Sequence, residues 1–297
     1  MSFVRGGKSQ LVKKRTRNSY HKIVQCVNCG LQQLFPLPTL KEDAIYYDIN
    51  PHDRETTPEF SVEDIYSKFE FQNQSRIRYL ENFGIEKHWK ILDYGCGYGF
   101  FIEMMEREGY CLDGIEISKD KLVVCKARLG ETAKRIKAIN LLNEELPEYM
   151  ENRYDLITMF HLLEHITQPI ELLKKVKKML NEKGHLVIEV PNVANKMMEA
   201  SEAYNDFFYI RDHVAYYTPD ILKKLLLELG FRIVVCCGNQ VYGLTNHMNW
   251  IINGKPELKK PSYESCASMR WIEKIYKETM NCNMWAEYMY VIACKEK

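Results

Sequence analysis

A glycine-rich turn at residues 91–99, which read Ile-Leu-Asp-Tyr-Gly-Cys-Gly-Tyr-Gly, constrains the fold more than any other part of the chain. A short apolar strand leads into the turn, and a helical pattern begins at Phe100. In sheets of parallel strands, ligands bind at the carboxyl ends of the strands, where glycine lets the backbone approach them closely. A dinucleotide-binding turn needs glycine at its first, third and sixth positions, and Phe100 occupies the sixth. The turn therefore predicts a ligand site of another kind.

Strand and helix patterns alternate along the chain around this turn. Strands are expected at residues 90–93, 111–117, 136–139, 154–160, 185–190 and 288–293, and helices at 61–83, 101–108, 118–129 and 169–180. Thr218 and Pro219 mark the start of a further helix that Gly230 ends. This order predicts an α/β fold with a largely parallel sheet covered by helices on both faces.

Two acids near the turn indicate the ligand. Asp93 lies two residues before the first glycine, where it disfavours a pyrophosphate but suits a cationic amino group. Glu116 follows about 23 residues later, at the spacing used to bind ribose hydroxyls. An acid for an amine, open backbone for a carboxylate and an acid for a ribose together describe S-adenosylmethionine. The alternative is a tight turn with a chance pair of acids.

The chain resembles the class I S-adenosylmethionine-dependent methyltransferases over roughly residues 70–235. Residues 91–99 resemble the first motif of that family, and Y-D-L-I-T-M-F-H-L-L-E-H at 154–165 resembles its fourth strand and the turn that follows. G-H-L-V-I-E-V-P-N at 184–192 resembles the fifth strand, and D-H-V-A-Y-Y-T-P-D-I-L at 212–222 resembles a segment of the branch that modifies small molecules. The resemblance implies a Rossmann-like, doubly wound, mostly parallel seven-stranded sheet with a small N-terminal appendage.

The resemblance also implies roles for individual residues. Asp93 would contact the amino group of the methionine portion, Glu116 the ribose hydroxyls, and Ile117 the adenine. The implied cofactor-binding residues together are Asp93, Gly95, Cys96, Gly97, Glu116, Ile117, Asn140, Leu141, Phe160 and His161, with Asn143 or Glu144 as replacements at the adenine. The product left by the cofactor would be S-adenosyl-L-homocysteine.

Methyl transfer to oxygen or nitrogen also requires a proton to be removed, and histidine suits that role near neutral pH. His213 is the first candidate base, because it precedes an aromatic pair in the segment expected to cover the acceptor, and His161 is the second. His165 is expected to fix a turn or to contact the substrate. The tyrosines expected at the substrate are Tyr209, Tyr216 and Tyr217. A structural role is the alternative for each histidine, and no carboxylate set predicts a catalytic metal.

The amino-terminal part of the chain differs from the rest in charge. Residues 1–41 hold eight of the 41 lysines and arginines and no acid. This basic arm is either a solvated tail or a segment attracted to an anionic partner such as RNA. Cys26-Val-Asn-Cys29-Gly30 resembles one knuckle of the zinc ribbon that precedes many such enzymes. Zinc needs four ligands, and only His21 could supply a third, so we expect a packing hairpin without zinc.

The domain prediction is an arm and linker at residues 1–60, followed by one methyltransferase domain at 61–297 with an insertion at about 238–284. The helical pattern of the insertion fits core packing, a homodimer interface or a cap over the acceptor. No apolar run approaches the ~20 residues of a membrane span, and the basic amino terminus lacks an apolar segment. With ten cysteines expected to be free thiols, these features predict a soluble, cytoplasmic protein.

The predicted function is methyl transfer from S-adenosylmethionine to an oxygen, nitrogen or carbon atom of a small molecule. Its acceptor is expected, by family analogy, to be a sugar, a nucleotide-linked sugar, or an intermediate of a polysaccharide or natural product. One alternative is an RNA methyltransferase that uses the basic arm. The other is a cofactor-binding protein without catalysis that regulates a partner.

Overall fold

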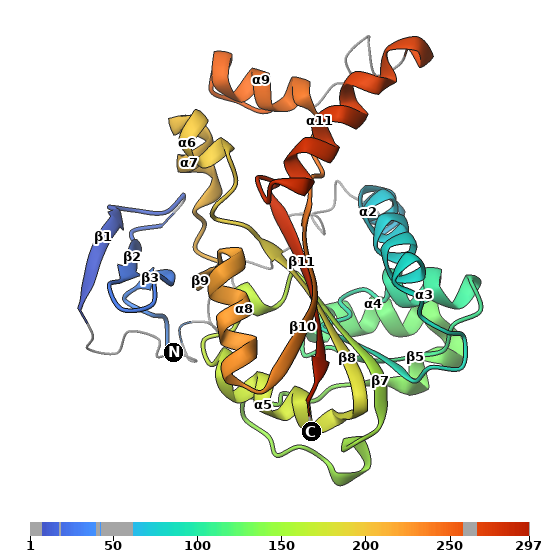
Figure 1. Cartoon of the computed structure of the whole chain (residues 1–297). Coiled ribbons are helices and arrows are strands. Elements are labelled where there is room, and N and C mark those ends of the chain that lie inside the picture. Colours follow the sequence, from blue (N-terminus) through green and yellow to red (C-terminus); the bar gives the residue numbers. More distant parts are fainter. Residues whose placement is uncertain (1–7, 18, 40–41, 43–61, 258–265, 297) are drawn as a thin grey trace. The chain divides into compact units, whose positions relative to one another are not determined.

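The computed structural model describes residues 8–17, 19–39, 42, 62–257 and 266–296. The chain divides into two compact units. Figure 1 labels the helices and strands of both. One contains residues 38–160, 170–187 and 294–297 and is called here the glycine-turn unit. The other contains residues 1–37, 161–169 and 188–293 and is called the histidine unit. The boundary predicted at residue 60 lies outside the described residues.

The glycine-turn unit alternates helices and strands. Its main elements are α2 (Val62–Phe83), β4 (Ile91–Tyr94), α3 (Phe100–Arg107), β5 (Leu112–Ile115), α4 (Lys119–Leu129), β6 (Ile136–Lys137) and β7 (Tyr154–Phe160). Strand β4 pairs in parallel with both β5 and β7, and β5 pairs in parallel with β6. All four residues of β4 are buried, as expected for a strand inside a parallel sheet.

The large sheet has seven strands in the order β10-β11-β8-β7-β4-β5-β6. The strands not yet introduced are β8 (Leu180–Pro191), β10 (Phe231–Asn239) and β11 (Tyr288–Lys295). From β4 the chain first builds β5 and β6 toward one edge, and β7 is then added on the other side of β4. This topology confirms the predicted Rossmann-like fold and places its switch point at the carboxyl ends of β4 and β7, where such sheets bind ligands.

Local signals account for the helices that border these strands. Ser118 caps α4, and Thr218 caps α8 (Pro219–Glu228), whose first residue is the predicted proline. Helix α5 (Pro169–Met179) ends one residue earlier than expected, because β8 begins at Leu180 and is longer than predicted. Gly184 permits this longer strand, since a Cβ at that position would lie 2.8 Å from the carbonyl oxygen of Tyr154.

The histidine unit contains a second, four-stranded sheet with the order β1-β2-β3-β9. Its strands are β1 (Ser9–Lys13), β2 (Lys22–Cys26), β3 (Gln32–Phe35) and β9 (Ala215–Tyr216), and they pair antiparallel. A hydrophobic cluster joins Ile23 and Leu34 of the amino-terminal strands to Tyr216 of β9. The described part of the basic arm is therefore a packed sheet.

The region predicted as an insertion contains α9 (Leu244–Asn253) and α11 (Arg270–Cys282), beside the earlier helices α6 (Met197–Ala200) and α7 (Glu202–Phe208). Several of its apolar side chains are exposed, among them Ile251, Trp271 and Ile275.

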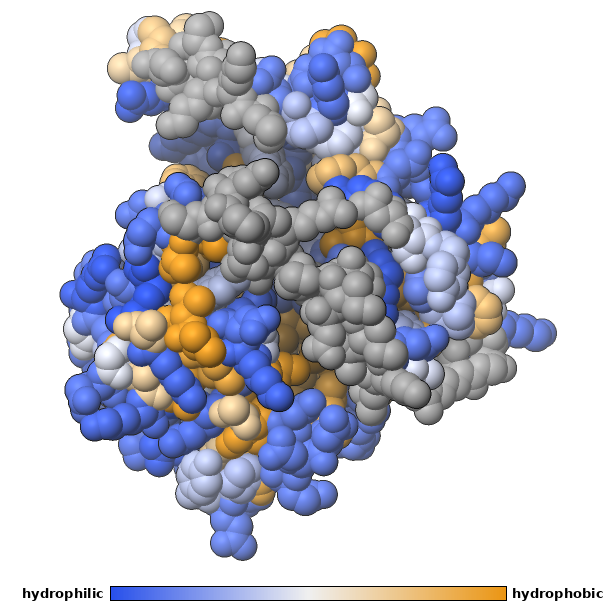
Figure 2. Space-filling view, turned by 180° about the vertical axis from the view of Figure 1, so that it is seen from behind, coloured by the Kyte–Doolittle hydropathy of each residue, from blue (hydrophilic) through white to orange (hydrophobic). Residues whose placement is uncertain are grey.

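On the face of the molecule shown in Figure 2, hydrophobic residues gather in a strip between hydrophilic ones. Within the described ranges, no helix is long and apolar enough to cross a membrane.

Candidate active site

The backbone of the glycine turn is fixed by hydrogen bonds and leaves space beside Gly97. Gly95 and Gly97 both have positive φ angles, 85° and 55°, which glycine adopts without strain. The amides of Gly95 and Cys96 donate to the carbonyl of Ile115 at 2.8 and 3.0 Å, which ties the turn to the end of β5. A Cβ on Gly97 would meet no heavy atom of the described residues within 4 Å, so this glycine borders open space. Gly99 differs, because a Cβ there would lie 2.8 Å from the sulfur of Cys125.

Glu116 lies beside the turn and accepts three backbone hydrogen bonds. Its Oε2 accepts from the amide of Gly97 at 2.9 Å, and its Oε1 accepts from Ile117 at 2.8 Å and Ser118 at 2.7 Å. These bonds orient the carboxylate at the carboxyl end of β5. The next side chain, Ile117, is 60% exposed although it is apolar. An oriented carboxylate beside an exposed apolar side chain suits a nucleoside.

Asp93 is a buried acid at the end of β4. Its carboxyl group is 4% exposed, and Oδ1 accepts a hydrogen bond from the hydroxyl of Thr158 at 2.7 Å. Burial raises the pKa of Asp93 to about 6, with Thr158 and Arg76 opposing the shift and Glu116 adding to it. The guanidinium of Arg76 lies 4.5 Å from the ring centroid of Phe160. An ionised Asp93 would gain from a further cation, which the amino group of S-adenosylmethionine supplies.

The glycine-turn unit therefore fits S-adenosylmethionine by its own chemistry. It offers an acid for an amine, an open glycine for close approach, and an oriented acid with an apolar neighbour for a nucleoside. The sequence predicted Asp93, Gly97, Glu116 and Ile117 for these roles, and the fold brings them to one end of the strands β4 and β5. Sequence reasoning missed Arg76 and Thr158, which stand in segments that carry no glycine motif.

Other residues predicted to bind the cofactor are buried or hydrogen-bonded within the fold. The thiol of Cys96 is buried and hydrogen-bonded to the free thiol of Cys125, so its predicted contact with the cofactor depends on its backbone. Leu141 is 1% exposed. The amide of Asn140 donates to Glu144 at 2.8 Å, and its side-chain oxygen accepts from Leu142 at 3.1 Å. Asn140 and Glu144 thus stabilise a turn, and their contact with adenine stays a prediction.

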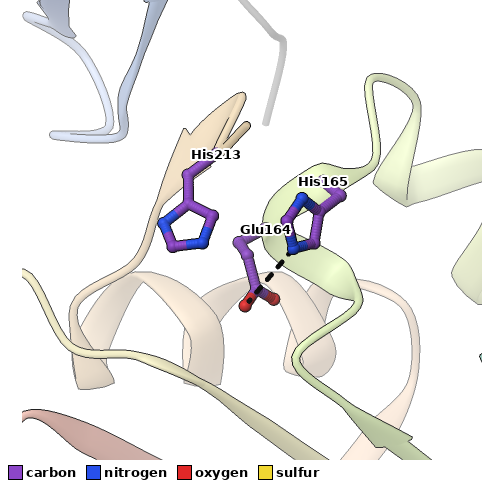
Figure 3. Close-up of side chains that lie close together, drawn as sticks. All are labelled: Glu164, His165 and His213. Carbon is purple, nitrogen blue, oxygen red and sulfur yellow. Dashed lines mark ion pairs between the residues drawn. The ribbon is translucent and has the colours of Figure 1, made fainter. Parts of the chain in front are cut away.

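The histidine unit holds a buried carboxylate among histidines. Glu164 belongs to the short helix η4 (Leu163–His165) and is 1% exposed. Its Oε1 lies 3.4 Å from Nδ1 of His161 and 4.0 Å from Nε2 of His165. Ligand atoms of Glu164, His165 and His213 all lie within 4.8 Å of one another (Figure 3). Burial alone would raise the pKa of Glu164, but the contact with His161 and the charges of the histidines lower it to about 2.

His161 has an unusual backbone conformation. It directly follows Phe160, the last residue of β7, and its φ is 49°, in the left-handed region that non-glycine residues rarely adopt. Its amide donates to the carbonyl of Glu189 at 2.9 Å, and its Nε2 lies 3.6 Å from the Oε2 of the same residue. Glu189 is fully buried, and the ring of Tyr288 packs edge-on against the imidazole. His161 therefore lies between two buried carboxylates, Glu164 and Glu189.

The three predicted substrate tyrosines lie in the histidine unit and are all buried. The hydroxyl of Tyr209 donates to Gln32 at 2.7 Å, and that of Tyr216 donates to the carbonyl of Ile210 at 2.8 Å. These two hydroxyls are engaged within the fold. The hydroxyl of Tyr217 has no hydrogen-bond partner among the described residues, and burial together with the charge of Glu164 raises its pKa.

Sequence reasoning missed the two glutamates, although each had a visible signal. Glu164 directly precedes His165, and Glu189 interrupts an otherwise apolar strand.

The residues considered for zinc lie elsewhere. Cys26 and Cys29 lie at the β2–β3 hairpin, and Nδ1 of His21 is hydrogen-bonded to the hydroxyl of Ser19 at 2.6 Å. Within the described part of the chain, Glu164, His165 and His213 are the one group of three such side chains close enough to hold a metal.

Comparisons with known proteins support S-adenosylmethionine as the cofactor. A family model described as a methyltransferase domain matches residues 47–235. A ubiquinone biosynthesis O-methyltransferase from Aliivibrio fischeri is 30% identical over 121 residues, which cover 40% of this chain and 52% of that protein. The chain thus spans about half the length of the curated relatives it matches.

Two solved structures show the same fold at low sequence identity. A SAM-dependent methyltransferase from Archaeoglobus fulgidus aligns with a TM-score of 0.51 at 22% identity, covering 84% of this chain and all of that one. Phosphoethanolamine N-methyltransferase 2 from Haemonchus contortus, in complex with S-adenosyl-L-methionine, gives 0.54 at 16% identity, covering 90% and 62%. By the family model, the chain belongs to the methyltransferase domain family, and its fold is that of the class I S-adenosylmethionine-dependent methyltransferases.

Proposed function

We propose that this protein methylates a hydroxyl oxygen of a small molecule, of the class formed by sugars, nucleotide-linked sugars and related polysaccharide or natural-product intermediates. When bound, S-adenosylmethionine supplies an activated methyl group on a sulfonium. The name of the curated relatives, O-methyltransferase, supports oxygen as the acceptor atom. The observation that carries the proposal is His161 held between two buried carboxylates, because an oxygen acceptor must give up a proton.

The cofactor-binding roles follow from the glycine-turn unit. Asp93 binds the amino group, Glu116 binds the ribose hydroxyls, and Ile117 contacts the adenine. Gly97 leaves space for the methionine portion. Since methyl transfer is a displacement in which alignment supplies much of the rate, the task of these residues is positioning.

We assign His161 the role of general base. A base oriented by an acid is a recurrent catalytic arrangement, and His161 contacts Glu164 on one nitrogen and Glu189 on the other. Its left-handed backbone also fits a functional role, because such strain persists mainly where the surrounding structure and function require it.

Small-molecule acceptors are favoured over RNA by the described part of the basic arm. Lys13 forms an ion pair with Asp206 and donates to the side chain of Asn205 at 2.8 Å. The guanidinium of Arg17 stacks 3.9 Å from the ring centroid of Phe207. These two cations are engaged within the histidine unit, which reduces the charge that the arm can offer to phosphates.

The test is incubation of the purified protein with isotopically labelled S-adenosylmethionine and, separately, a small-molecule extract and total RNA. Label is expected in a small-molecule product that mass spectrometry identifies as a methyl ether. Label in the RNA would overturn the acceptor class. Cofactor binding with no labelled product in either fraction would favour a non-catalytic regulatory protein.

A further inference from the structure

The cluster of Glu164, His165 and His213 has the composition of a metal centre. Two imidazoles and one carboxylate form the ligand set of many open transition-metal sites, with the remaining positions left to water or substrate. Three ligand atoms of this cluster already lie within 4.8 Å of one another (Figure 3). Ligands on one tetrahedral ion lie about 3.4 Å apart, so side-chain rotations that bring the ligand atoms closer by at most about 1.4 Å would complete the site.

The backbone holds the ligands together. Glu164 and His165 come from η4, whereas His213 comes from the segment just before β9. The amide of Val214 donates to the carbonyl of Glu164 at 2.8 Å, which clamps these two segments beside the cluster. The rings of His165 and His213 meet edge to face, with centroids 5.0 Å apart. A site that depends on distant segments is thus fixed by main-chain bonding.

The tautomer of His165 favours a cation at this place. Its Nδ1 lies 2.9 Å from the carbonyl oxygen of Asp212, and a carbonyl can only accept, so Nδ1 carries a proton. In the neutral ring Nε2 then presents a lone pair, and it faces Oε1 of Glu164 at 4.0 Å. Histidine ligands commonly donate their second nitrogen to a backbone carbonyl in this way, which orients the ring toward the metal.

The carboxylate and one neighbour add a second, independent indication. Oε2 of Glu164 is buried and has no hydrogen-bond partner among the described residues. The buried hydroxyl of Tyr217 likewise has no hydrogen-bond partner among the described residues. A buried carboxylate oxygen without a partner is costly, and a bound ion would compensate it. Water on an open coordination position would offer Tyr217 a partner as well.

We propose that Glu164, His165 and His213 bind a divalent first-row transition-metal ion. The site is distinct from the cysteine pair Cys26–Cys29, and metal binding there does not depend on the identity of the methyl acceptor. An extension rests on the proposed function. A hydroxylated acceptor would supply an oxygen ligand to the open position, where the ion would ease loss of its proton.

The experiment titrates chelator-treated, full-length protein with Co²⁺, whose visible absorption reports coordination, and measures bound metal per chain. One ion per chain is expected, with a spectrum of nitrogen and oxygen ligands. Glu164→Gln and His213→Gln should each weaken binding at least about 100-fold, since loss of a ligand exceeds the 10- to 100-fold effect of outer-shell changes. His88→Ala, at a histidine with a 76% exposed side chain, is the matched control and should bind as wild type.

Two further measurements keep the result interpretable. The double variant Cys26→Ser/Cys29→Ser should leave the Co²⁺ spectrum unchanged. Excess metal should raise the melting temperature of wild type but not of Glu164→Gln, and cofactor binding by each variant checks that it is folded. Absence of stoichiometric binding, or equal affinity in wild type, Glu164→Gln and His213→Gln, would overturn the proposal. Because none of these readouts uses activity, they stand apart from the test of methyl transfer.

Discussion

Two buried carboxyl groups, one in each unit, have opposite pKa shifts. Asp93 in the glycine-turn unit is 4% exposed with a pKa of about 6, whereas Glu164 in the histidine unit is 1% exposed with a pKa of about 2. Burial raises both pKa values, so the difference comes from the neighbours. Asp93 has a threonine hydroxyl and the charge of Arg76, while Glu164 has three histidines.

The charges around these two carboxyl groups suit different ligands. Asp93 is short of positive charge, which suits a site that receives a cationic cofactor. Glu164 stays ionised beside three histidines, which suits a site that binds a cation. The glycine turn also comes from one short segment and its neighbouring strand, whereas the histidine cluster is assembled from residues as distant as His161 and His213.

The largest effect is expected from removing the base. His161→Gln should lower kcat about 100-fold or more, the usual contribution of general base catalysis, while the affinity for cofactor changes little. Steady-state kinetics on the identified acceptor and calorimetric cofactor titration measure the two quantities. His88→Ala, at an exposed histidine, is the control and should keep the wild-type kcat. An unchanged kcat in His161→Gln would transfer the role to another group.

Removing the charge of Asp93 should weaken cofactor binding rather than lower kcat. Asp93→Asn should weaken S-adenosylmethionine about 10- to 100-fold, because a hydrogen bond to a charged group contributes roughly 1.5–3 kcal/mol. Asp113→Asn, on the neighbouring strand β5 and paired with Arg153, is the control and should bind as wild type. Wild-type affinity in Asp93→Asn would remove the amine contact from the cofactor assignment.

The raised pKa of Asp93 predicts a pH dependence of the same contact. The carboxyl group is ionised above about pH 6 and neutral below it, so its attraction for the cationic amino group is lost as the pH falls. Cofactor affinity should therefore decline between pH 7 and pH 5, approaching tenfold per unit below the pKa. Titrations at several pH values test this, and the decline should be absent in Asp93→Asn. An equal decline in that variant would place the titrating group elsewhere.

The smallest effect is expected from alanine substitutions at two glycines, of which only one borders the proposed cofactor position. Gly97 and Gly109 both have positive φ angles, and a Cβ on either would meet no heavy atom of the described residues within 4 Å. Alanine at either position should cost about 1–2 kcal/mol of unfolding free energy, measured in denaturant. Only Gly97→Ala should also weaken cofactor binding, because its Cβ would enter the cofactor space. Equal affinities in the two variants would contradict the placement of the cofactor at Gly97.

The residues of the candidate cofactor site could be proposed from the sequence because they lie close together along the chain. Strand, turn and acid follow one another from Ile91 to Glu116, and the alternating strand and helix patterns were enough to predict a largely parallel sheet around them. The longer β8 was missed because Gly184 resembles a helix terminator in sequence, while its role is to let two strands approach. Arg76 and Thr158 were missed because their proximity to Asp93 depends on the packing of α2 and β7.

The sequence by itself determined the fold class, the turn and the acids that define the cofactor, since a contiguous backbone conformation demands particular residues at fixed spacing. Only the tertiary structure decided that His161, Glu164, His165, Glu189 and His213 form one cluster. Their side chains meet through strand order and main-chain bonds between distant segments, which periodicity along the chain does not encode. The cluster is consequently where the chemistry of this protein is most open to experiment.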